Sequence, residues 1–249
     1  MRLLMFALLA LSTLPCSWAS TPIIRNELRE VKQLLIVVTE NWASTKGKLV
    51  CFEKRLNGTW SSVFQKHFPV LLGKNGLAWG IGVHPTQKEK MKIEGDGRSP
   101  AGIFKVGKVY GESESLPKGS DYPYHKISEH DAWVDDPKNP FYNQHVKIEK
   151  LKDKPNWFES QRMRLGDPAY RWLIEIRHNS NLPKPGYGSA IFFHVRRTPE
   201  RRTTGCTVMS ITNIENLIKF LKEKKNPHYI LLPRKEYDKR RPLYKFPKL

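Results

Sequence analysis

The chain is poor in cysteine, with three in 249 residues. Cys16 lies within residues 1–19, and only Cys51 and Cys206 lie beyond them. Two thiols cannot form a disulfide framework, so the fold must depend on a hydrophobic core. A single Cys51–Cys206 disulfide stays open, as does burial of Cys51 as a core thiol within the apolar run 49–52.

Long apolar runs are also missing, except at the start of the chain. Residues 3–14 are apolar, Arg2 precedes them, and Ser17-Trp18-Ala19 offers a small-x-small cleavage site. This pattern predicts a secretory signal peptide over residues 1–19, because the run is too short to span a membrane. An uncleaved anchor is the alternative. We expect export to the periplasm or cell envelope, with no stable membrane span after cleavage.

Acidic residues are outnumbered, with 24 against 43 basic residues and a net charge of +19. Such a charge favours polyanionic partners, and for an exported protein these are anionic envelope polymers. Export and the lack of a recognition module argue against nucleic acid. Plain solubility is an equally good interpretation of the charge. A phosphate-binding loop is excluded as well, because the glycine-rich stretch 95–104 has no Gly-Lys-Ser or Gly-Lys-Thr.

Short β-prone runs separated by turn residues make up most of the chain. Asn57-Gly58 indicates a hairpin, and one amphipathic helix is expected over 212–225, with Thr212 and Glu215 as a capping box. The expected strands are 33–39, 48–54, 59–63, 68–73, 76–82, 171–176 and 228–232. We predict a mainly β domain, a sandwich or part-closed barrel with one or two helices.

The domain should occupy residues 32–233. Residues 20–31 are expected to be a linker, and 111–154 an inserted turn-rich loop. Residues 234–249 are basic and contain two prolines, which predicts a surface-bound or mobile tail.

One histidine and one cysteine are placed where they could react together. The apolar run 190–193 leads into His194, and Gly205-Cys206 begins another short apolar run twelve positions later. A cysteine nucleophile needs a neighbouring base, since the thiolate is the attacking species. The spacing alone leaves open a structural histidine and a buried core thiol.

The inserted loop raises the question of a metal site. It contains a scatter of histidines and aspartates: His125, His130, Asp131, Asp135, Asp136 and His145. Their spacing fits no helical or hairpin ligand pattern, and solvated loop side chains are the usual alternative. We therefore expect no metal and no cofactor.

Thr203-Thr204-Gly205-Cys206, with His194 before it, resembles the active-site signature of the L,D-transpeptidase (YkuD-type) catalytic domain. That signature has a histidine followed by a [Ser/Thr]-x-Gly-Cys box. Three further blocks, 95–104, 133–143 and 170–194, resemble a divergent short-loop branch in family order. The resemblance implies the family's β-rich fold. It also implies a cysteine-dependent L,D-transpeptidase that acts on peptidoglycan stem peptides through a thioester.

The resemblance implies roles for individual residues. Cys206 would be the nucleophile, His194 the base, and the backbone N–H groups of Thr204, Gly205 and Cys206 the oxyanion hole. Many family members have His at the position of Thr204, and Arg soon after the cysteine, where this chain has Val208 and Met209. The residue that would contact a substrate carboxylate in this chain is therefore not identified by the resemblance.

Substitutes for that contact can be named. We expect Arg98, His178, Arg196 and Arg202 to bind substrate. The connecting loop, which also contains Arg197 and Arg201, could equally be solvated, and His178 could simply cap its strand. Cross-linking, exchange and carboxypeptidase activity stay open, as do another envelope cysteine hydrolase and a non-catalytic binding protein for cell wall or polyanions.

Overall fold

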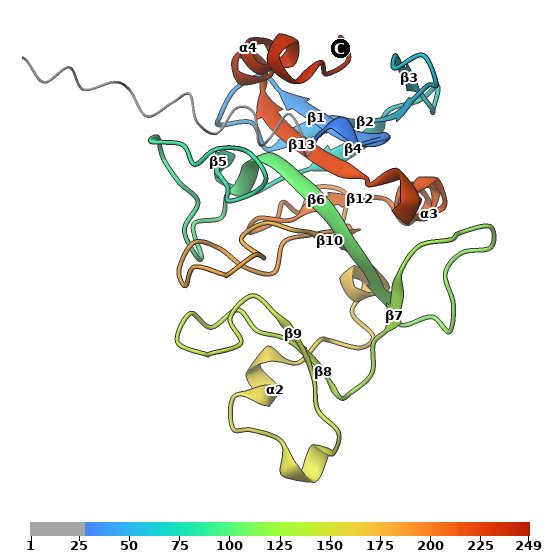
Figure 1. The fold of residues 1–249 in the computed structure, drawn as a ribbon. Coiled ribbons are helices and arrows are strands. Elements are labelled where there is room, and N and C mark those ends of the chain that lie inside the picture. The colour runs from blue at the N-terminus through green and yellow to red at the C-terminus, as the bar shows by residue number, and fades with distance from the viewer. Residues whose placement is uncertain (1–27) are drawn as a thin grey trace, which may run out of the picture.

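The computed structural model describes residues 28–249 (Figure 1). The predicted signal peptide and most of the predicted linker lie outside these residues. The main strands are β1 (Gln33–Thr39), β2 (Lys46–Lys54), β4 (Phe68–Leu71), β6 (Ser99–Gly111), β10 (Trp172–Ile176), β11 (Phe192–Val195), β12 (Thr207–Met209) and β13 (His228–Pro233). Shorter strands are β3 (Trp60–Ser62), β5 (Leu77–Trp79), β7 (Tyr124–Lys126), β8 (Asp131–Trp133) and β9 (His145–Lys147). The helices are α2 (Phe158–Gln161), α3 (Ile211–Phe220) and α4 (Arg234–Tyr244), with 3-10 turns η1 (Leu151–Asp153), η2 (Pro168–Tyr170) and η3 (Glu223–Lys225).

Eight strands form a closed barrel. Their order is β1-β13-β6-β10-β11-β12-β4-β2, and the pairing of β1 with β2 closes the circle. The β1–β13 and β11–β12 pairs are parallel, while the other pairs of the barrel are antiparallel. The structure confirms the mainly β prediction and shows that the barrel is fully closed, which leaves its strands no free edge.

Strand β6 connects the barrel to the insertion. It pairs with β13 and β10 in the wall, and with the short strands β5 and β7 beyond it. Figure 1 shows it running from the barrel toward the β8–β9 hairpin and α2. The stretch predicted as an inserted loop therefore contains one strand added to β6 and one separate hairpin.

Helix α3 was predicted with the wrong ends. Its N-cap is Ser210, whose hydroxyl accepts the Asn213 N–H, so Thr212 and Glu215 do not form the expected capping box. Glu215 instead accepts from the Trp172 indole N–H. The helix ends at Phe220 because the buried amide of Gln33 binds the Phe220 carbonyl and the Lys222 N–H.

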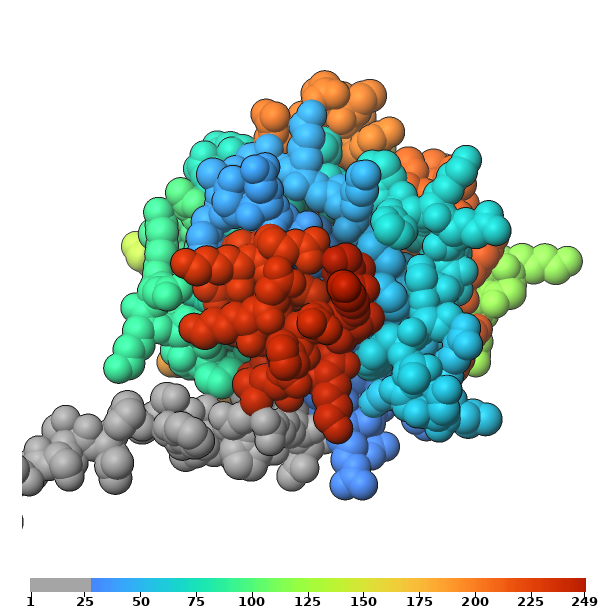
Figure 2. Space-filling view, turned by 90° about the horizontal axis from the view of Figure 1, so that it is seen from above, coloured from blue at the N-terminus to red at the C-terminus, as the bar shows by residue number. Residues whose placement is uncertain are grey.

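The prediction that residues 234–249 form a surface-bound or mobile tail is wrong. Residues 234–244 form α4, and Tyr237 and Phe246 are buried in the main core. The Arg240 guanidinium lies 4.7 Å above the ring of Trp79. In Figure 2, α4 and the residues after it cover one end of the molecule. Within residues 28–249, no helix has both the length and the apolar character needed to cross a membrane.

Candidate active site

Two parallel neighbouring strands position the predicted catalytic pair. His194 lies in β11 and pairs with Val208 of β12, while Cys206 immediately precedes β12. Both side chains line the same two adjoining cavities, of about 400 and 210 Å³. The structure thus brings the predicted base and nucleophile to one cleft. A larger cavity, of about 770 Å³, lies elsewhere and is lined by neither residue.

Within residues 28–249, Cys51 and Cys206 are both free thiols, so the Cys51–Cys206 disulfide is not formed. Cys51 is buried in β2. The Cys206 thiol donates to the Ala190 carbonyl at 3.4 Å, and its sulfur accepts the Phe192 N–H at 3.4 Å. Two backbone groups therefore fix the sulfur at the cleft.

Ala190 holds that carbonyl in an unusual backbone conformation, with a φ of 52°. This left-handed region is unfavourable for a residue with a Cβ, so the surroundings must impose it. The Asn143 side chain accepts the Ala190 N–H at 3.0 Å and donates to the carbonyls of His178 and Asn179. Asn143 thus links the insertion to the loop that orients Cys206.

His194 is buried, and the orientation of its ring determines which nitrogen can accept a proton. Its Nδ1 lies 2.9 Å from the Val195 carbonyl, so Nδ1 carries the proton and Nε2 is left as the acceptor. Burial lowers the pKa of His194 to about 4, an effect to which the nearby Arg197 charge adds. The imidazole is therefore neutral at pH 7 and able to take a proton.

The Cys206 pKa is raised, because burial disfavours the thiolate. Three groups act in the opposite direction: the Phe192 N–H, the Lys92 ammonium and the Arg197 guanidinium. Proton removal from this thiol consequently needs a base close by.

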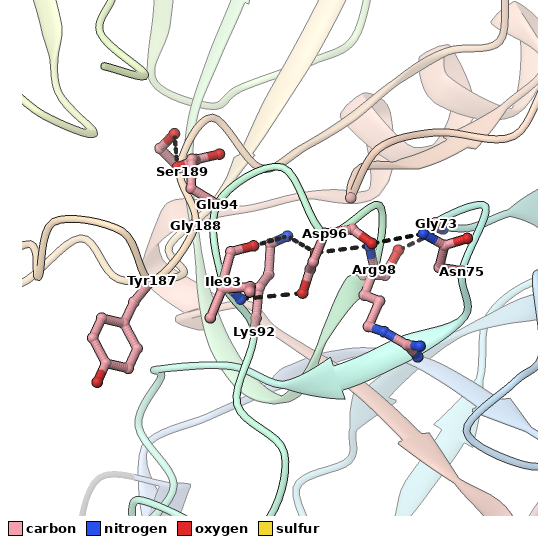
Figure 3. Close-up of polar contacts among 12 residues, drawn as sticks. Gly73, Asn75, Lys92, Ile93, Glu94, Asp96, Arg98, Tyr187, Gly188 and Ser189 are labelled. Atoms are coloured by element: carbon pink, nitrogen blue, oxygen red, sulfur yellow. Dashed lines mark hydrogen bonds and ion pairs between the residues drawn. The ribbon is translucent and has the colours of Figure 1, made fainter. Parts of the chain in front are cut away.

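Lys92 is a buried charge behind the Gly205–Cys206 turn, with an exposed fraction of 2%. Its Nζ pairs with Asp96 at 2.8 Å, and Asp96 also accepts the N–H groups of Ile93 and Arg98 (Figure 3). A Cβ at Gly205 would lie 2.9 Å from Ile191 Cδ1 and 3.4 Å from Lys92 Nζ. Glycine at this position lets the turn pack closely against the Lys92 loop.

The loop that contains Lys92 also forms hydrogen bonds to segments on the other side of the cleft. Glu94 accepts a hydrogen bond from the Ser189 hydroxyl at 2.7 Å (Figure 3) and another from the Tyr142 hydroxyl. Ser189 precedes the strained Ala190, and Tyr142 precedes Asn143. The loop that contains Glu94, the insertion and the loop before β11 are therefore joined by partly buried polar contacts.

Thr203 organises the turn that carries Cys206. Its hydroxyl donates to the Cys206 carbonyl at 2.6 Å and accepts the Gly205 N–H at 3.1 Å. This corrects the oxyanion-hole prediction at Gly205, whose N–H is already engaged. The N–H groups of Thr204 and Cys206 remain the candidate oxyanion donors.

Arginines surround the larger cavity of the site. They are Arg164, Arg196, Arg197, Arg201 and Arg202, against a single acidic residue, Asp167. Arg197 forms a bidentate pair with Asp167, at 3.0 and 2.7 Å, and this pairing lowers the Asp167 pKa. Arg202 donates to the Thr45 hydroxyl at 2.8 Å. The cleft is positively charged and suited to carboxylates.

Two predicted substrate contacts lie outside the cleft. The Arg98 guanidinium donates to the Leu77 carbonyl at 3.1 Å and lines a separate small cavity. His178 is buried, with Nδ1 accepting the Ile81 N–H and Nε2 bound to the Tyr187 carbonyl. Both predictions are corrected, because backbone groups satisfy these side chains and neither residue lines the two cavities of the cleft. Arg196 and Arg202 do line it.

Sequence reasoning did not find several groups of the site. Arg164 and Asp167 come from the segment after α2, and Lys92 comes from the loop just before the glycine-rich stretch. A lone lysine or aspartate in a basic, loop-rich chain carries no spacing signal. The Asp167-Pro168 pair could have been recognised as the cap that it forms for η2.

A family model, the L,D-transpeptidase catalytic domain (YkuD), matches residues 55–230. No curated protein and no solved structure matches the chain. The matched region contains the strands that carry His194 and Cys206 and the insertion that lines their cleft. Since it spans more than half of the sequence, the chain belongs to the L,D-transpeptidase catalytic domain family.

Proposed function

We propose that this protein is a cysteine-dependent L,D-transpeptidase of the periplasm or cell envelope that acts on peptidoglycan stem peptides. The observation that carries the proposal is the shared cleft of Cys206 and His194, surrounded by arginines. Family membership supports the reaction class. The positive cleft supports a substrate rich in carboxylates, as stem peptides are.

Acylation begins with the thiol. His194 Nε2 takes the Cys206 proton, and the thiolate attacks the carbonyl carbon of the amide that joins an L-centre to a D-amino acid. The oxyanion is held by backbone N–H groups of Thr204 and Cys206. As the C–N bond breaks, His194 returns the proton to the departing amine. A thioester on Cys206 and a free D-amino acid result.

The second half-reaction releases the thioester. An acceptor amine loses a proton to His194 and attacks the thioester carbonyl, which forms a new amide and frees the thiolate. An amine from a second stem peptide gives a cross-link, and a free D-amino acid gives exchange. Water in place of the amine gives carboxypeptidation.

Mass spectrometry of muropeptides tests the proposal. Reduced enzyme is incubated with disaccharide tetrapeptide, using wild type, Cys206→Ala and His194→Ala. Cys51→Ala is the matched control, because that thiol is buried away from the cleft. We expect the terminal D-amino acid to be lost with wild type and Cys51→Ala only. The ratio of dimer to tripeptide then separates cross-linking from hydrolysis. Equal inactivity of wild type and Cys206→Ala would reject the catalytic assignment.

A second candidate function is binding without catalysis, which the net charge of +19 favours. An anionic envelope polymer would then be the ligand. Sacculus binding that falls with salt and survives Cys206→Ala, without turnover in wild type, supports this alternative. A covalent mass adduct of a carbapenem on Cys206 supports the transpeptidase instead.

A further inference from the structure

A second polar cluster gathers three chemistry-bearing side chains that are scattered along the inserted loop. His125 comes from β7, Asp131 from β8 and His145 from β9. Both imidazole Nε2 atoms lie 2.7 Å from the same Asp131 Oδ1. One nitrogen or oxygen from each residue lies within 4.8 Å of the others. The fold thus creates a cluster that the sequence spacing did not predict.

We propose that His125, Asp131 and His145 bind a divalent transition-metal ion, with zinc as the ion that best fits these donors. Two imidazoles and one carboxylate, with a further position open to water, form a common zinc ligand set. Both histidine side chains are partly exposed, at 22% and 19%, while the Asp131 side chain is fully buried. An ion can therefore approach from the histidine side.

The carboxylate is oriented as a metal ligand requires. Asp131 Oδ2 accepts the backbone N–H of Ser128 at 2.8 Å and the Ser128 hydroxyl at 2.6 Å. These two donors hold Oδ2 and leave Oδ1 facing the imidazoles. Such outer contacts fix the orientation of a ligand before the metal arrives.

Zinc binding requires a small adjustment of both rings. In a tetrahedral site with bond lengths of about 2.0–2.1 Å, each nitrogen would lie roughly 3.3 Å from the carboxylate oxygen. Each ring must therefore move outward by about half an ångström, and the Nε2 protons must leave or move to Nδ1. The exposed sides of the two histidines leave space for this movement.

A metal here would brace one wall of the catalytic cleft. Trp133 pairs with His145 across the β8–β9 hairpin, and its ring lies edge-on to Phe192, with centroids 4.7 Å apart. Phe192 donates its N–H to the Cys206 sulfur, and Trp133 lines the cleft. The ion would join β7, β8 and β9, and so hold the hairpin that carries Trp133.

Calorimetric titration with zinc chloride tests the site. The protein is stripped with chelator, freed of any affinity tag, and carries Cys206→Ser so that the catalytic thiol cannot bind the ion. In this background, His125→Gln and His145→Gln keep an amide donor toward Asp131 but remove the imidazole. His67→Ala is the matched control, because His67 is exposed and directly precedes β4.

We expect one zinc per chain, and an affinity at least about tenfold lower in either glutamine variant. His67→Ala should bind as the parent does. Hydrogen exchange should show zinc-dependent protection of residues 124–147 in the parent and in His67→Ala, but not in the glutamine variants. No saturable binding in the parent, or undiminished binding in a His125→Gln/His145→Gln double variant, would overturn the proposal.

Discussion

Lys92 shows how one buried charge beside the Cys206 thiol can affect both stability and thiol reactivity. Its ammonium is paired with Asp96 at 2.8 Å, and both side chains are largely buried. Lys92→Met would leave Asp96 buried without its cation, which costs about 3–5 kcal/mol in the free energy of unfolding. Lys92→Met/Asp96→Asn should lose less. Urea unfolding of the three proteins measures both values, and equal losses would contradict the pairing.

The same lysine should affect the reactivity of the Cys206 thiol. Its charge lowers the pKa of Cys206 against the effect of burial. In the folded double variant, we expect the pH profile of Cys206 alkylation by iodoacetamide to move to higher pH. Lys90→Met, which removes an exposed lysine of the same segment, is the control. An unchanged profile would show that the sulfur does not sense Lys92.

Single residues differed in how well the sequence revealed them. His194 and Cys206 were selected because their sequence blocks resemble the family signature, and the structure places both side chains at one cleft. Arg98 and His178 were assigned to substrate wrongly, since which backbone carbonyl a side chain reaches depends on the tertiary fold. Lys92 could not be distinguished from the other lysines of a basic chain.

The insertion depends on Asn143 as its link to the barrel. That side chain joins Ala190, His178 and Asn179. Asn143→Ala leaves buried partners unsatisfied at about 1–3 kcal/mol each, and it frees Ala190 from its strained conformation. We expect a loss of stability by urea unfolding and slower alkylation or turnover of Cys206. Gln144→Ala, an exposed neighbour, should change neither property.

Helix α4 is the element that most needs testing, because its sequence is strongly basic. Tyr237 is its fully buried side chain. We expect Tyr237→Ala to cost about 3–5 kcal/mol, as for other buried aromatics. Lys239→Ala on the exposed face should cost little. A similar small effect for both variants in denaturant unfolding would place α4 outside the cooperative unit.

Elements were predictable where the apolar pattern was dense. Strands β1 and β13 follow from apolar runs such as 34–38 and 229–232, and the Asn57-Gly58 turn revealed the β2–β3 hairpin. Helix α4 was missed because its charged residues hide one buried tyrosine. The end of α3 was misplaced because Gln33, almost two hundred residues away, caps it.

The whole molecule should lose stability in mild acid. Burial lowers the pKa of His84 and His194 to about 4, and that of His178 to about 3, against an ordinary value of 6.5. Below pH 6.5 the unfolded chain therefore binds protons that the folded chain does not. The free energy of unfolding should fall between pH 6.5 and 4, by up to about 1.4 kcal/mol per pH unit for each histidine. Urea unfolding at pH 7.5 and pH 5 measures this change, and equal stabilities would contradict it.

The pairing of β1 with β13 determines when the barrel can close as the chain is synthesised. These parallel partners come from opposite ends of the described chain, and β13 also pairs with β6. During synthesis, the barrel cannot close until residue 233 is available. Until then, β1 and β6 expose unpaired backbone edges that can bind other chains. A chain that stalls late is therefore the form most in need of a chaperone.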